Sequence, residues 1–511
     1  MLKEFCEIFN YAEGISRFLN TMSRSSKRND QEYFKQWERF VNTLQQALFF
    51  ASFLIFGKPA LGQQVPAFAA GVTLGTISIP ELGEASGLVA SRNNADVLWI
   101  HNDSGNPAHL FAIDTNGRWL GTYTPSGEKN VDWEDIGIGP GPITNVLYLY
   151  IGDIGDNREH RSHIKVFQIP EPAVYVRQHT NPVTVNFKGV RAITLTYPDG
   201  AHNAESLFMD PLTGDMFIIT KERKTSRVYT APKAALDTSL NIKLSFVRNI
   251  AFDQPSGADI SPAGTEIIIR YEDYAMLWTR NPSQTVGDAL GGTSVRVPVI
   301  GRPIEPNGEA VAFTKTGNGY YTVSEGVSPK LYYFERTNGT DPPKFQALIP
   351  AGAAWNYLGK GTDQGTEWRN LNFNDSCWSN GITQFGNGND CEYTRITHRE
   401  NPTNETITIY FRKTFTASKA SSLTRLTLKL VMADGAAVYL NGVNVLNYQL
   451  PIHHNYGTPA SATQAPNLED TWFSFPISPE LLANGTNILA VEVHKATPKG
   501  SDLIPILTNN R

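Results

Sequence analysis

The sequence lacks the short motifs that usually identify an enzyme mechanism. It contains no GxSxG elbow, no HExxH, no Walker loop ending in GK[ST], and no GxGxxG after a predicted strand. These absences set aside several common hydrolytic and nucleotide-dependent chemistries. A Ser/His/Asp triad assembled from distant parts of the chain stays open, with Ser86 or Ser256 as the nominal nucleophile. The sequence therefore identifies no catalytic residue.

The chain also lacks an excess of positive charge. Its formal charge is -5, with 44 basic against 49 acidic residues. Proteins that bind nucleic acids usually carry clustered Lys and Arg, so we expect no nucleic acid partner. The sequence instead has 42 Gly, 31 Pro and 11% aromatic residues, a balance that suits short strands joined by tight turns. We therefore predict an all-β protein.

No hydrophobic run is long enough to span a bilayer comfortably. The most apolar stretch, 47–56, is about ten residues long and follows a basic segment. Small residues at 60–62 follow it, as a signal peptidase requires. We predict that 1–62 is a signal peptide with a long n-region, with an uncleaved anchor or a buried amphipathic helix as the alternatives. The mature protein would be secreted or periplasmic, with no stable membrane span after cleavage.

Cysteine is scarce, with three in 511 residues. Cys6 lies in the predicted signal peptide, so only Cys377 and Cys391 would remain after export. A disulfide between them would be worth about 3 kcal/mol in the chain-entropy model. Two reduced thiols are the alternative. No Cys/His spacing predicts a zinc site.

A repeated unit occupies the chain between about 75 and 350. In each copy, an acidic or small polar residue opens a short strand, and a second, more apolar strand ends 16 to 19 residues later at another acidic position. The five copies open near Glu84, Glu134, Glu205, Ser256 and Glu309. Repeats of 50 to 70 residues with about four strands are typical of propeller blades. An open sandwich or a solenoid is the alternative.

The repeats predict a β-propeller over 63–350, followed by a jelly-roll β-sandwich over 351–511. Five copies indicate five blades, although the 71-residue step from Glu134 to Glu205 leaves room for a sixth. An early strand within 71–79 would complete the last blade and close the ring.

The acidic positions of the repeats predict a metal site. Inner strands of a propeller line one channel, so residues at equivalent positions converge and like charges must be neutralised. Calcium, which accepts six to eight oxygen ligands, is the expected cofactor. The predicted metal ligands are Glu84, Asp103, Glu134, Asp135, Asp153, Asp156, Glu205, Glu222 and Glu309. Basic residues near them are predicted to bind an anionic substrate, namely His101, Arg158, His202, Lys221, Arg223 and Arg270. Alternatively, the acidic residues bond the backbone of neighbouring blades.

The second part has the pattern W.Y, DS.W, FG.G, YFRK.F, DG..VYLNG and N.LAVEVH between Trp355 and His494. It resembles the galactose-binding-like domain of secreted bacterial phosphoesterases and glycosidases. The chain ends soon after Asp502, so the last edge strand is expected to be short or absent. Members of that fold often bind sugars, and exposed Trp368, Trp378 or the pair at 453–454 would be the contacts. The alternative is a packing module with Trp in its core.

The repeat pattern, with its DWED and GDIGDN segments, resembles the phytase-like and esterase-like propellers of bacterial secreted proteins. This resemblance implies calcium and phosphoesterase chemistry. Two functions stay open. The first is a secreted, metal-dependent hydrolase, phosphoesterase-like, with a carbohydrate-binding-type accessory domain. The second is a non-catalytic protein that binds a small molecule or a glycan outside the cell. We lean to the hydrolase.

Overall fold

The computed structural model describes residues 65–187, 189–338, 347–360, 362–386, 393–396, 407–496 and 508–510. By compactness the chain divides after Val65, and the unit from Pro66 to Arg511 is described here. The predicted signal peptide lies outside the described residues. Among the residues described, no helix has the length and apolar character needed to cross a membrane. The unit is mostly β, as predicted.

Within the described residues, strands β1 to β22 form five sheets. The first contains β2 (Ala85–Ala90), β3 (Val97–Asn102), β4 (Leu110–Asp114), β5 (Trp119–Pro125) and β9 (Val183–Phe187). The second contains β6 (Trp133–Pro140), β7 (Leu147–Asp153), β8 (Ile164–Pro170), β10 (Arg191–Thr196) and β14 (Asn241–Lys243). The third contains β11 (Ala204–Met209), β12 (Met216–Thr220), β13 (Ser226–Ala231) and β15 (Ser245–Ile250).

The fourth sheet contains β16 (Gly257–Ile260), β17 (Glu266–Tyr271), β18 (Tyr274–Thr279) and β19 (Ser294–Val297). The fifth contains β20 (Gly308–Phe313), β21 (Gly319–Ser324), β22 (Lys330–Glu335) and β1 (Val72–Thr76). Short helices connect some strands, namely η1 (Val176–His179), α3 (Lys233–Thr238) and α4 (Val286–Leu290). The sheets pack through separate clusters of buried apolar side chains.

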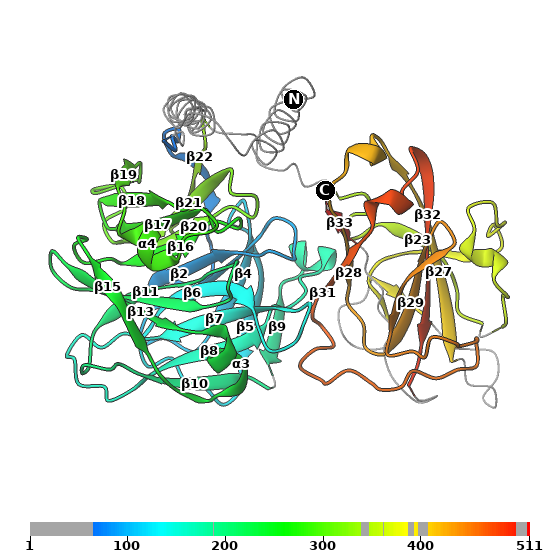
Figure 1. Cartoon of the computed structure of the whole chain (residues 1–511), viewed down its shortest axis with the longest axis horizontal. Coiled ribbons are helices and arrows are strands. Elements are labelled where there is room, and N and C mark those ends of the chain that lie inside the picture. Colours follow the sequence, from blue (N-terminus) through cyan, green and yellow to red (C-terminus); the bar gives the residue numbers. More distant parts are fainter. Residues whose placement is uncertain are drawn as a thin grey trace, which may run out of the picture. The chain divides into compact units, whose positions relative to one another are not determined.

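The five sheets have a propeller-like arrangement. The inner strand of each sheet contacts the inner strands of two others, in the closed order β2, β6, β11, β16, β20 and back to β2. These five strands lie together in the middle of the sheets in Figure 1. The early strand β1 pairs antiparallel with β22, as predicted, so the ring is closed by the two ends of this segment.

The long step between the second and third repeats does not hold a further sheet. Its strands β9 and β10 join two existing sheets instead, with β9 parallel to β5 and β10 antiparallel to β8. Five sheets are therefore formed by the described residues 72–335.

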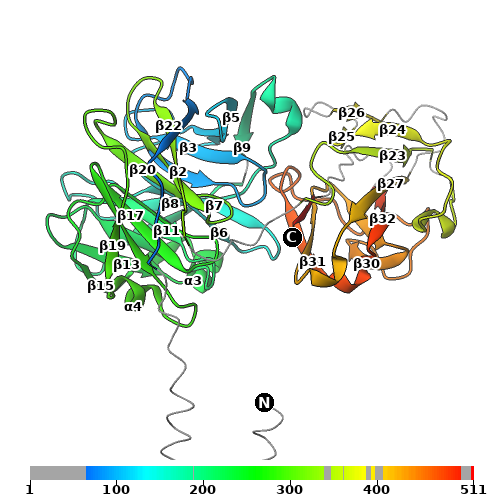
Figure 2. The same ribbon diagram turned by 90° about the horizontal axis from the view of Figure 1, so that it is seen from above.

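The second part forms three more sheets from the described residues beyond 350 (Figure 2). A six-stranded sheet contains β24 (Ser379–Ile382), β23 (Ala354–Leu358), β27 (Thr408–Ala417), β32 (Gly485–His494), β29 (Gly435–Leu440) and β30 (Val443–Tyr448). The others are β31 (Phe473–Ile477) with β28 (Leu426–Leu430) and β33 (Thr508–Asn510), and β25 (Phe385–Gly386) with β26 (Thr394–Arg395). The remaining helices are η2 (Glu367–Arg369), η3 (Ala420–Ser422) and η4 (Pro479–Leu481). The short last edge strand is therefore β33.

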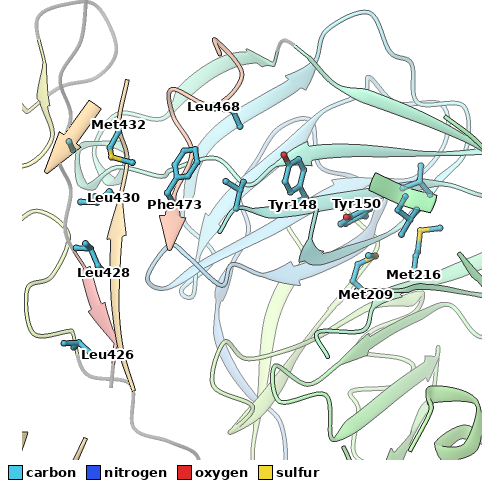
Figure 3. Packing of buried hydrophobic residues seen from close by; sticks show 14 of the residues in the cluster. Tyr148, Tyr150, Met209, Met216, Leu426, Leu428, Leu430, Met432, Leu468 and Phe473 are labelled. Atoms are coloured by element: carbon cyan, nitrogen blue, oxygen red, sulfur yellow. The ribbon is translucent and has the colours of Figure 1, made fainter. Parts of the chain in front are cut away.

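One hydrophobic cluster includes side chains from both groups of sheets. Figure 3 shows Tyr148 and Met209 from the propeller-like sheets, and Leu428 and Phe473 from the second part. The indole N–H of Trp472 donates to the Asn94 side chain at 2.7 Å. Burial of aromatic and aliphatic groups of this size is worth about 1.5–3 kcal/mol per side chain. The two parts are thus joined by a buried apolar contact as well as by the chain.

Candidate functional site

β-Bulges near the start of three inner strands each insert one glutamate. Trp133 pairs with Asp153 and Asp135 with Gly152, so Glu134 between them has no opposite residue. The same shift in register leaves out Glu205 in β11 and Glu309 in β20. A bulge bends the strand and re-aims the extra side chain. Three of the sequence repeats therefore place a glutamate at the same position of their inner strand.

The sheet built on β16 differs at this place. Gly257 pairs with Arg270 and the ladder continues without a shift in register. No glutamate is inserted there, and the Arg270 guanidinium fills the space beside Gly308. The first sheet also has a shift, between Ala85 and Leu88, but it holds Ser86 and Gly87.

The three bulge glutamates interact with one another and with residues that follow or precede the neighbouring strands. Asp103, Asp132 and Glu134 each offer a carboxylate oxygen, and these oxygens all lie within 4.8 Å of one another. Lys221 forms an ion pair with Glu205. We call this set the acidic cluster: Asp103, Asp132, Glu134, Glu205, Lys221 and Glu309.

Burial and mutual repulsion raise the pKa values of the carboxyl groups in this cluster. Burial, followed by the charges of Glu205 and Asp103, holds the pKa of Glu134 well above its usual range. Burial and then Glu205 raise the pKa of Glu309 to about 8. Burial also raises the pKa values of Asp103 and Asp132. The cluster therefore holds more negative groups than its surroundings stabilise.

Lys221 supplies the positive charge within the cluster. Burial disfavours its charged form, but Glu205 and Glu309 outweigh this effect and raise its pKa. Burial likewise raises the pKa of Glu205, although the ammonium of Lys221 opposes the shift. One ammonium faces five carboxyl groups, so acidic groups are in excess in this cluster.

The GDIGDN segment forms one wall of the cluster. A Cβ atom at Gly155 would collide with Glu134 and Asp132, so only glycine lets the backbone pass so close to these carboxylates. Behind the wall, Arg161 pairs with Asp153 at 2.7 Å. Asp156 accepts a hydrogen bond from the Arg161 amide at 2.7 Å, which shapes the loop. Both aspartates were predicted as metal ligands, and both have partners within the loop.

The other predicted metal ligands also have partners of their own. Glu84 is exposed and accepts a hydrogen bond from Asn106 at 2.5 Å, at the edge of the cluster beside Asp103. Glu222 pairs with Arg227 at 2.7 Å. Asp135 accepts from the backbone N–H groups of Ile136, Leu207 and Ala258. Asp135 therefore links three inner strands. It is an acidic residue that bonds the backbone of neighbouring sheets, which was the alternative to a metal ligand.

The structure brings only one predicted substrate-binding group, Lys221, into the cluster. Arg270 is fully buried and pairs with Glu305 at 2.7 Å. His101 is fully buried, and burial lowers its pKa to about 4, so it is neutral at neutral pH. His202 stacks against Tyr229. The exposed side chains of Arg158 and Arg223 complete the predicted set.

The predicted contacts of the second part are divided between core and surface. Trp368 is fully buried and packs edge to face on Tyr410, so it is a core residue and no exposed sugar contact. Trp378 is partly buried against Trp368 and Phe373. Cys377 is exposed with a free thiol. Its predicted disulfide partner, Cys391, lies outside the described residues.

Asp132 is the residue of the cluster that sequence analysis missed. It precedes β6 and lies two residues before Glu134. Its acidic side chain lies in the same DWED segment as the predicted ligands Glu134 and Asp135. The signal was therefore present in the DWED segment.

No family model matches the chain, and no curated protein matches it. Its solved structural neighbours are distant. A chain of the nidogen/laminin complex is 13% identical over 48% of this chain and 73% of its own length, with a TM-score of 0.29. A β-glycosidase from Bacteroides vulgatus is 17% identical over 32% of this chain and 20% of its own, with a TM-score of 0.22. β-Glucuronidase 2 of Bacteroides uniformis is 18% identical over 33% of this chain and 18% of its own, with a TM-score of 0.22. The chain thus spans a fifth or less of these two glycosidases, and it is a mostly-β protein with distant similarity to both kinds of structure.

Proposed function

We propose that this protein is a secreted or periplasmic hydrolase that binds calcium at the acidic cluster and acts on an anionic substrate of the phosphoester class. The observation that supports it is the set of three bulge glutamates facing one another with a single lysine. In this proposal the five sheets are a five-bladed β-propeller over 63–350, and the second part is a jelly-roll, galactose-binding-like accessory domain over 351–511.

Calcium fits the chemistry of the donor set. Asp103, Asp132 and Glu134 offer only carboxylate oxygens, which are the ligands that calcium prefers. A divalent cation would neutralise the like charges that raise the pKa of Glu134. Bound calcium would supply a positive centre that polarises a phosphate oxygen.

Two further side chains have suitable roles beside the ion. The ammonium of Lys221 would neutralise a second oxygen of the anionic substrate. Glu309, whose pKa burial and Glu205 raise to about 8 in the ion-free protein, is the group that can donate a proton to a leaving group.

The test is a calorimetric titration of the full-length protein with calcium, followed by turnover of nitrophenyl phosphate mono- and diesters. We expect binding in the micromolar range, and at least a tenfold loss of affinity in Glu134→Gln. Glu222→Gln is the matched control, because Glu222 pairs with Arg227 outside the cluster. The control should bind calcium like the wild type. Absence of calcium binding in the wild type would overturn the proposal.

The second candidate is a non-catalytic protein that binds a ligand or glycan. The two serines named as possible nucleophiles favour it, because both are buried and both hydroxyls donate hydrogen bonds to backbone carbonyls. Ser86 donates to the Glu134 carbonyl at 2.6 Å, and Ser256 donates to the Gly308 carbonyl at 3.1 Å. Calcium binding without turnover of either substrate would support this candidate and exclude phosphoester hydrolysis of these two kinds.

A further inference from the structure

A second group of ligand-type side chains lies in the six-stranded sheet of the second part, far along the sequence from the acidic cluster. Glu492 and His494 are two residues apart at the end of β32, so they point to the same face of the sheet. His454 comes from the loop that follows β30. Their ligand atoms all lie within 4.8 Å of one another. We call them the His–Glu–His trio.

The two histidines are fixed by backbone carbonyls on their outer sides. Nδ1 of His454 lies 3.0 Å from the Pro451 carbonyl, and Nδ1 of His494 lies 2.7 Å from the Thr458 carbonyl. A carbonyl oxygen only accepts hydrogen bonds, so both Nδ1 atoms must donate. A neutral imidazole that donates from Nδ1 carries a lone pair on Nε2.

Both Nε2 atoms face the carboxylate of Glu492, which also accepts hydrogen bonds from Arg369 and Tyr439. Nε2 of His454 lies 3.0 Å from Oε1 of Glu492, and Nε2 of His494 lies 3.5 Å from Oε2. Nε2 of His494 is buried and has no hydrogen-bond partner among the described residues. The Arg369 guanidinium also lies 3.3 Å from Oε1 of Glu492, so the buried polar atom of the trio that is left without a hydrogen-bond partner is Nε2 of His494.

We propose that the trio is a binding site for a first-row transition metal ion, zinc above all. Zinc takes His nitrogen and carboxylate oxygen at about 2.0–2.2 Å in a tetrahedral arrangement, so its ligand atoms lie about 3.3 Å apart. The two Nε2 atoms lie 3.0 and 3.5 Å from different oxygens of Glu492, and one ligand atom from each of the three residues lies within 4.8 Å of the others. Imidazole ligands favour zinc over calcium or magnesium. The Nδ1 bonds to carbonyls are the outer-shell contacts that orient metal-binding histidines.

A cavity lies beside one member of the trio, His454. His454 lines a cavity of about 490 Å³ together with Arg369, Tyr439, Asn444 and Asn447. Tyr439 donates to Oε1 of Glu492 at 2.7 Å, which leaves Oε2 directed at His494. Three protein ligands leave the fourth position of a tetrahedral ion to water or to an oxygen atom of a ligand.

The experiment is a titration of the untagged full-length protein with zinc chloride by calorimetry, with bound metal counted by mass spectrometry after dialysis. We expect one zinc ion per chain with a Kd below 1 μM, and at least a tenfold loss of affinity in His454→Gln. The matched control is His453→Gln, which removes a neighbouring histidine of the same cavity but no member of the trio. The control should keep wild-type affinity.

Two further variants keep the result interpretable. Glu492→Gln should also lose zinc, and circular dichroism of each variant without metal will show whether the fold is retained. Glu134→Gln should bind zinc like the wild type, because it lies in the other cluster. The inference is overturned if the wild type retains no zinc at 100 μM metal, or if His453→Gln weakens binding as much as His454→Gln does. Its outcome is independent of the calcium titration.

Discussion

Glu134 and Asp135 are neighbours in the sequence, and both are buried, yet their surroundings are opposite. Asp135 accepts hydrogen bonds from Ile136 and Leu207 at 2.8 Å and from Ala258 at 3.2 Å. Glu134 faces other carboxylates. The bulge at this point is what separates them, because it turns one residue out of the ladder while its neighbour stays in it.

Asp135 is a buried acid with a structural role, whereas Glu134 is a buried acid whose charge requires a ligand. Asp259 repeats the structural use, since it accepts from the amides of Ile260 and Phe313 at 2.8 and 2.7 Å. A carboxylate that holds backbone N–H groups of neighbouring strands stabilises the ring of inner strands. Like charges held together at three bulges destabilise that ring. Removing the charge should therefore lower the free energy of unfolding at Asp135 and raise it at Glu134.

The largest effect is expected for Asp135→Ala, which leaves amides of three inner strands without their acceptor. The expected cost is about 3–5 kcal/mol of unfolding free energy, since each buried unsatisfied donor costs about 1–3 kcal/mol. Asp135→Asn keeps the shape and one acceptor oxygen and should cost about half as much. Urea unfolding followed by tryptophan fluorescence measures both. A cost below 1 kcal/mol for Asp135→Ala would show that these bonds do not hold the ring.

The next effect is a dependence of stability on pH that arises from Glu309. Its pKa of about 8 in the folded protein exceeds its unfolded value of 4.5. Between these values the folded protein holds a proton that the unfolded chain has lost, so stability falls as the pH rises from 4.5 to 8. The expected fall is about 2–4 kcal/mol without calcium.

Unfolding in urea at pH 5, 6.5 and 8 in the presence of EGTA would measure this fall. Glu309→Gln has no carboxyl group to titrate and should show a smaller slope than the wild type. Added calcium should also reduce the slope, because the ion stabilises the charged form. An equal slope in the wild type and in Glu309→Gln would assign the pH dependence to other groups.

The repeats predicted the fold because each copy contains its own strands and turns. The inner strands, the closing strand β1 and the positions of Glu134, Glu205 and Glu309 all follow from the same spacing. The number of sheets was left open, because strand pairing over long separations decides whether β9 and β10 form a new sheet or extend two others. The residues of 183–196 do not by themselves specify which strands β9 and β10 pair with.

The candidate sites were predictable to different degrees. The spacing of the repeats indicated convergent acids, but it could not show that Arg270 is neutralised by Glu305, because 35 residues separate them along the chain. The His–Glu–His trio was missed for a related reason. Adjacent histidines at 453–454 were weighed as a pair, whereas the partners of His454 are Glu492 and His494 on a distant strand. The pairing of β30 with β29 and of β29 with β32 brings that segment close.

A smaller effect is expected for Lys221→Met. The methionine keeps an apolar side chain of similar length but removes the cation that pairs with Glu205. Glu205 would then be buried beside Glu134 and Glu309 with no counter-charge, which should cost about 1–2 kcal/mol at pH 7.5 without calcium. The double variant Lys221→Met/Glu205→Gln removes both charges and should recover most of this loss in urea unfolding. A double variant as unstable as Lys221→Met would show that the lysine acts through packing and not through charge.

The smallest effect has the opposite sign. Glu134→Gln keeps the shape of the side chain but removes one of the charges that repel each other, so the calcium-free protein should gain about 1 kcal/mol at pH 7.5. The wild type should gain stability when calcium is added, by an amount that rises with the logarithm of its concentration, and Glu134→Gln should lose most of that gain. Thermal unfolding with EGTA and with 1 mM calcium separates the two effects. A loss of stability in the calcium-free variant would mean that Glu134, like Asp135, is held by bonds that its charge strengthens, and the contrast between the two neighbours would then disappear.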